Sequence, residues 1–178
     1  SKELAITLPV IILIFDYIFM SDFKFSKVAE KKYFHIPFWT ISIFLLLLQF
    51  YFFKPIEVTG IENLWPGYSY YLTQPWILMK YLSLLLIPTG LCIDHQFKPI
   101  IAITEYRAVI SYIFIICITI FSWKLYKIRS SRSKVLLFGI IWFFIILLPT
   151  LIFIVHIGER HLYLSGIGFY MVLSVLFL

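Results

Sequence analysis

Five long, nearly uncharged apolar stretches constrain the fold of this chain more than any other feature. A bilayer core about 30 Å thick is crossed by about 20 apolar helical residues, and the stretches that meet or approach this length are 4–20, 36–53, 108–126, 135–154 and 162–178. Only 13% of the residues are charged, against about a quarter in soluble domains. These features exclude a soluble enzyme, a DNA-binding module and a disordered chain. They predict an all-α, polytopic bundle of about five transmembrane helices in one partial membrane domain.

The basic residues predict which loops face the cytoplasm. Nine of the 15 lysines and arginines lie in two short loops, namely Lys24, Lys27, Lys31 and Lys32 in one and Lys124, Lys127, Arg129, Arg132 and Lys134 in the other. The positive-inside rule places both loops in the cytoplasm. The net charge of +6 is therefore a topology signal, and such clusters bind anionic lipid. We expect membrane lipid as a partner and no nucleic acid.

A sixth apolar run, from Ile77 to Pro88, needs a separate interpretation. From Ile77 to Ile87 it covers about 16 Å as a helix, roughly half of the membrane. If it crossed the bilayer, the two basic loops would face opposite sides. We therefore expect an interfacial or re-entrant helix over about 74–88, inside an extracytoplasmic loop over 54–107.

Most of the polar variety falls on the extracytoplasmic side. The segment 68–76 is rich in Tyr and Trp, which suit the headgroup level of a membrane. It is either an aromatic belt that holds the interfacial helix or one wall of a groove for a lipid-linked substrate. Asp94 beside His95 has the residue types of an acid/base pair or a metal site. Adjacent residues rarely converge on one ion, so the pattern alone favours a polar loop.

Two pairs of adjacent, oppositely charged residues are also expected on the extracytoplasmic side. Arg160 suits an anionic headgroup, with Glu159 as its counter-ion, although an arginine that only reaches the interface fits the spacing as well. Lys2-Glu3 is a similar pair ahead of the first apolar stretch. Asp16 lies near the other end of that stretch, where an acid must face protein or reach the interface. We expect Asp16 to cap or anchor the helix and not to act in catalysis.

Three of these segments, taken in order, resemble the TMTC-like proteins. These are GT-C glycosyltransferases with a membrane domain and, typically, C-terminal tetratricopeptide repeats. The similar segments are residues 1–9 running into Phe15-Asp16-Tyr17, the outer-loop segment from Tyr71-Leu72-Thr73-Gln74 to Asp94, and Glu159-Arg160 followed by Leu162-Tyr163-Leu164, Gly166 and Gly168. The sequence departs from the family pattern at Ser165, where proline is usual, and at His95, where an aromatic residue often follows the aspartate.

The resemblance implies transfer of a sugar from a polyprenyl-phosphate carrier to an acceptor, expected to be a protein hydroxyl. The reaction would occur on the outer face of a bacterial or archaeal plasma membrane. The implied substrate-binding residues are Lys2, Glu3, Tyr71, Thr73, Gln74, Asp94, Glu159, Arg160 and Tyr163. Lys2 and Arg160 would hold the lipid phosphate, and no metal or other cofactor is expected.

The family places its catalytic carboxylate in an outer loop that would precede Ser1, and its repeats would follow Leu178. We therefore expect this chain to be the middle of the enzyme and to be inactive alone. Two other functions stay open from the sequence. One is a non-enzymatic transporter or assembly scaffold, although inverted repeats and mid-membrane charges are not visible. The other is an O-antigen ligase or polymerase-like enzyme, which also uses outer loops and arginine clusters.

Overall fold

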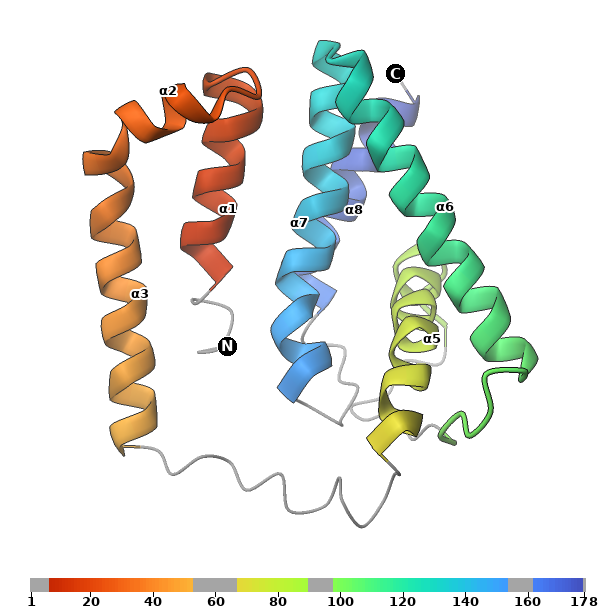
Figure 1. Cartoon of the computed structure of the whole chain (residues 1–178). Helices are drawn as coiled ribbons and strands as arrows, with labels where there is room; N and C mark the ends of the chain where they lie inside the picture. Colours follow the sequence, from red (N-terminus) through yellow and green to blue (C-terminus); the bar gives the residue numbers. More distant parts are fainter. Residues whose placement is uncertain (1–6, 53–66, 90–97, 154–161, 178) are drawn as a thin grey trace.

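The computed structural model describes residues 7–52, 67–89, 98–153 and 162–177, and within these ranges every regular element is helical. The elements are α1 (Leu8–Phe15), the π-helical turn η2 (Asp16–Met20), α2 (Phe25–Glu30), α3 (Lys32–Phe52), α5 (Gly67–Leu86), α6 (Tyr106–Ile128), α7 (Ser131–Phe153) and α8 (Leu162–Phe177). Figure 1 shows their arrangement. The expectation of an all-α fold is confirmed for the described part of the chain.

Helices occupy all five expected apolar stretches, but their lengths differ. In the described ranges, α6 and residues 131–151 of α7 are long and apolar enough to cross a membrane. The apolar helices Leu8–Met20, Lys32–Leu48 and Leu162–Phe177 are shorter, at 10–17 residues each. Two crossings are therefore supported by length and composition, and the expected total of five stays a prediction.

The helices pack around two clusters of buried apolar side chains. One cluster joins α1 and η2 to α6 and α7, and it includes Ile11, Ile18, Phe23, Leu125 and Phe138. The other joins α5 to α7 and α8, and it includes Ile77, Tyr81, Leu84, Phe143, Leu147 and Leu162. Because α7 contributes to both clusters, it is the central helix of the molecule.

Helices α7 and α8 approach each other closely through two glycines. A Cβ atom placed on Gly139 would lie 2.7 Å from the carbonyl oxygen of Gly168, and one placed on Gly168 would collide with the carbonyl oxygen of Gly139. Small residues permit this separation, which is common where helices pack within membranes. The Gly168 that carries part of the family resemblance thus has a packing role in this fold.

The two basic loops lie at the same end of the molecule, here called the basic end (Figure 1). The ammonium group of Lys134 binds Oδ1 of Asp22 at 2.7 Å. The Arg129 guanidinium lies over the rings of Phe23 and Tyr126, with its central carbon 5.3 and 5.6 Å from their centroids. Both basic loops therefore lie at one end of the molecule, and their expected cytoplasmic location stays a prediction.

Helix α5 begins at Gly67, earlier than the expected start near 74, and lies beside the half of α6 remote from the basic end. Ile100 contacts Ser69 and Thr73 in the first turns of α5. The chain therefore returns after α5 to the level at which that helix began, and α6 starts there. This path explains how the two basic loops share one end, because α6 starts at the level at which α5 began.

Candidate functional site

Four of the nine predicted substrate-binding residues lie in the described part of the chain: Tyr71, Thr73, Gln74 and Tyr163. The other five, Lys2, Glu3, Asp94, Glu159 and Arg160, lie outside the described residues. The described four belong to α5 and to the first turn of α8. The structure therefore places part of the predicted site and leaves its charged members as predictions.

Thr73 is fully buried and its hydroxyl is engaged with the backbone. Its Oγ1 donates to the carbonyl oxygen of Ser69 at 2.7 Å and accepts from the amide of Ile100 at 2.9 Å. The hydroxyl of Ser69 donates to the carbonyl oxygen of Ile100 at 2.6 Å. Ser69 and Thr73 are four residues apart and share a helix face, so together they fix the returning segment against α5.

Tyr71 and Gln74 lie on either side of Thr73 in the same helix. The Tyr71 side chain is exposed, and its carbonyl oxygen accepts a hydrogen bond from the hydroxyl of Tyr112 at 3.4 Å. Pro75 lacks the amide hydrogen that would otherwise bind the carbonyl four residues earlier, which belongs to Tyr71. The hydroxyl of Tyr112 takes the place of that missing donor. A proline is thereby tolerated inside α5.

The amide oxygen of Gln74 is buried and has no hydrogen-bond partner within the described ranges. Buried polar atoms normally have a partner, and leaving one without costs about 1–3 kcal/mol. Gln74 therefore offers a free hydrogen-bond acceptor, among the described residues, within the segment predicted to contact substrate.

Tyr163 is exposed at the start of α8, directly after the buried Leu162. Leu162 packs in the same cluster as Ile77 and Tyr81 of α5. This packing brings the first turn of α8 to α5, so two of the three segments that carry the family resemblance are joined through one core. The starts of α1, α5 and α8 all lie away from the basic end (Figure 1).

A second polar cluster, centred on Asp16, lies at the basic end. The Asp16 carboxylate is 2% exposed and accepts from Lys31 Nζ at 2.7 Å, His35 Nε2 at 2.8 Å and Ser21 Oγ at 3.0 Å. These contacts tie η2 to the following turn and to the junction of α2 and α3. The expected anchoring role of Asp16 is confirmed. The sequence signal that could have indicated the partners of Asp16 is the four-residue spacing of Lys31 and His35, which places both on one side of a helix.

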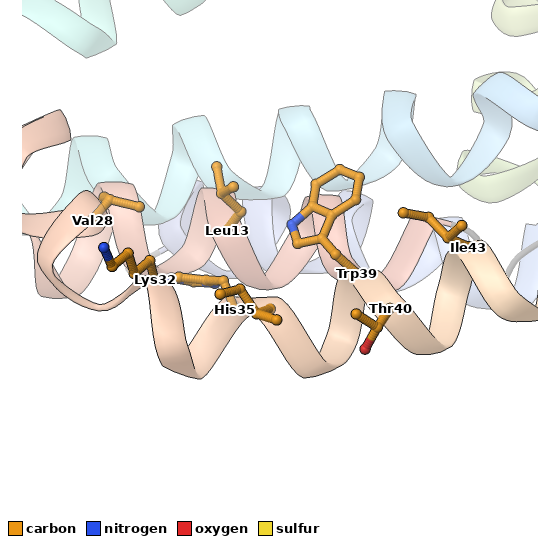
Figure 2. A pocket seen from close by; sticks show the side chains of 8 residues that line it. Leu13, Val28, Lys32, His35, Trp39, Thr40 and Ile43 are labelled. Atoms are coloured by element: carbon orange, nitrogen blue, oxygen red, sulfur yellow. The ribbon is translucent and has the colours of Figure 1, made fainter.

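An apolar slot of about 400 Å³ lies beside this cluster, between α1, α2 and α3 (Figure 2). Its apolar walls come from Leu13, Val28, Ile36, Trp39 and Ile43. Its ionisable lining residues are Lys32 and His35, both in the first turns of α3. Thr40 also lines the slot, but its hydroxyl donates to the carbonyl oxygen of Pro37 at 2.9 Å.

Among the described residues, no group of three or more His, Cys, Asp and Glu side chains is arranged to hold a metal ion. No protein-family model, curated protein or solved structure matches the chain.

Proposed function

We propose that the chain is an integral membrane protein whose five apolar helices cross the bilayer. Large apolar side chains exposed on α6 support this assignment: Val109, Ile110, Ile113, Ile116, Ile120 and Phe121. Only 17% of its most apolar 18-residue window is buried, whereas the core helix of a soluble protein is mostly buried. A surface of this kind is stable in lipid and unstable in water.

Within that class, we propose that it is the membrane part of a GT-C glycosyltransferase that uses a polyprenyl-phosphate sugar. The observation that carries the proposal is that three helices start away from the basic end. The segments before α1, at the start of α5 and before α8 resemble the family, and all three helices start away from the basic end. If the basic end is cytoplasmic, these segments meet the extracytoplasmic headgroup plane.

The chemistry of these segments suits that reaction. A lipid phosphate is an anionic leaving group at the membrane surface, and its departure requires stabilisation of negative charge. Lys2 and Arg160 would supply that charge, with Glu3 and Glu159 orienting them. The buried amide oxygen of Gln74, which has no hydrogen-bond partner among the described residues, suits a hydroxyl donor from the sugar or the acceptor. Asp94 would position a substrate hydroxyl.

The test is Arg160→Ala in the full-length protein. Membranes containing the variant are supplied with radiolabelled polyprenyl-phosphate hexoses, one at a time, and transfer to protein is counted. We expect transfer to fall about 100-fold, the usual effect of removing one preorganised donor to developing negative charge. Lys124→Ala is the matched control, because it removes a positive charge from the basic end. Near wild-type transfer by the Arg160→Ala protein would remove Arg160 from the mechanism.

A further inference from the structure

The slot between α1, α2 and α3 is apolar along its length, and its end nearest the basic loops, here called its polar end, is lined by Lys32 and His35. Lys32 and His35 lie where α3 leaves the basic end, and Trp39 and Ile43 follow on successive turns (Figure 2). From Lys32 to Ile43 the helix rises about 16 Å. Half of a bilayer core is about 15 Å. The slot therefore has the length of one membrane leaflet core, with Lys32 at the end where the headgroup of that leaflet would lie.

The polar end of the slot carries a positive charge, that of Lys32, which no described carboxylate neutralises. Asp16 already accepts hydrogen bonds from Lys31 and His35. Lys32 forms no ion pair with any carboxylate in the described part of the chain. Its ammonium lies 5.3 Å from the ring centroid of Tyr33. An anion at this end would meet Lys32, whose side chain lines the slot.

The Asp16 cluster holds this end of the slot in place. Hydrogen bonding of His35 Nε2 to Asp16 fixes the imidazole ring, which forms part of the slot wall. The Lys31–Asp16 ion pair, at 2.7 Å, fixes the turn immediately before Lys32. The polar end is therefore shaped before any ligand arrives, which reduces the entropy lost on binding.

We propose that this slot binds one anionic phospholipid from the leaflet at the basic end. Its phosphate lies against Lys32, and one acyl chain lies along Leu13, Trp39 and Ile43. A volume of about 400 Å³ is within the range of ligand pockets. This site is distinct from the proposed transferase site, which lies toward the other end of the helices, and it does not depend on glycosyl transfer.

The test uses Trp39 as a reporter in the full-length protein reconstituted into vesicles. Phosphatidylglycerol with dibrominated acyl chains is diluted into phosphatidylcholine, and a second set of vesicles carries the bromine on phosphatidylcholine instead. Bromine quenches nearby tryptophan fluorescence, and the Trp39 contribution is the wild-type signal minus that of Trp39→Phe. We expect phosphatidylglycerol to be preferred about fivefold, the factor of one lysine near an anionic lipid.

Lys32→Gln should bring this preference close to unity, and Lys32→Arg should keep it. Lys27→Gln is the matched control, because it removes a charge from the same loop but not from the slot, and it should retain the preference. Equal quenching by both lipids in the wild type would overturn the proposal, as would an unchanged preference in Lys32→Gln. Absence of Trp39 quenching by either lipid would overturn it too, since protein would then fill the slot.

Discussion

Asp22 and Lys134 join the two basic loops although they are far apart in the sequence. The hydrogen bond from the Lys134 ammonium holds the pKa of the Asp22 carboxyl below its ordinary value. Asp22 has φ 47°, a left-handed conformation that aspartate and asparagine tolerate better than most residues. The Asp22–Lys134 ion pair thus joins two loops whose other charged residues are mostly cationic.

Asp22→Asn should test this contact through its pH dependence. A lowered pKa in the folded state means that the carboxylate stabilises the fold above its unfolded pKa of about 3.9. That stabilisation is lost as the pH falls through the lower pKa of the folded state. Wild type should therefore unfold at a higher temperature than Asp22→Asn at pH 7, and the difference should shrink as the pH falls below about 4. A difference that persists unchanged to pH 3 would contradict the ionic contact.

At the scale of helices, the glycine contact between α7 and α8 sets the tightest packing in the described core. Gly168→Ala should destabilise the protein by about 1–3 kcal/mol, the usual cost of overpacking, because the added methyl meets the backbone of Gly139. Gly166→Ala is the control, since its Cβ would meet a flexible Leu85 methyl at 3.3 Å. Thermal unfolding in detergent measures both variants. Equal effects from the two substitutions would contradict the backbone contact.

Thr73→Val separates a structural role for Thr73 from a substrate-binding one. Valine keeps the shape but leaves the buried Ile100 amide without its acceptor, which costs about 1–3 kcal/mol. Hydrogen exchange at the Ile100 amide should accelerate, and Thr73→Ser should restore its protection. If Thr73→Val exchanged at the wild-type rate while sugar transfer fell, the hydroxyl would act on substrate instead.

At the scale of the whole molecule, the proposed membrane topology predicts which surfaces share a side of the bilayer. In a background with Cys92→Ser and Cys117→Ser, Tyr71→Cys and Tyr163→Cys should react with a membrane-impermeant maleimide added to intact cells. Both parent side chains are exposed, at 72% and 83%. Lys127→Cys should react only after permeabilisation. Reaction of Tyr71→Cys and Tyr163→Cys from opposite sides would separate α5 from the start of α8 and end the proposed common site.

Much of the helical organisation was predictable because helices suited to lipid require long apolar runs, which are visible in the sequence. Apolar runs and clustered lysines are local signals, and they located the helices and the shared end of the basic loops. The partners of Asp16 were only half predictable. An acid in an apolar run requires a partner. That the partners of Asp16 are Lys31 and His35 depends on the bend of the chain at η2 and α2.

The predicted transferase site shows where sequence reasoning stops. Tyr71, Thr73 and Gln74 are close in the sequence, yet their environments differ. Tyr71 is exposed, Thr73 is fully buried, and Gln74 is partly buried with an amide oxygen that no described residue contacts by a hydrogen bond. Helical geometry points consecutive residues in different directions, and only the neighbours in space decide which direction is buried. Thr73 accepts a hydrogen bond from the Ile100 amide only because the chain returns to α5 at Ile100.

The sequence by itself determined a helical chain rich in apolar segments and predicted that the two basic loops share one side, because hydrophobicity and charge act residue by residue. The tertiary structure decided which atoms meet: Asp16 with His35, Thr73 with Ile100, and Gly139 with Gly168. The slot beside α3 also depends on tertiary structure. Its walls come from separate helices, and their spacing follows from packing that no single stretch of sequence encodes.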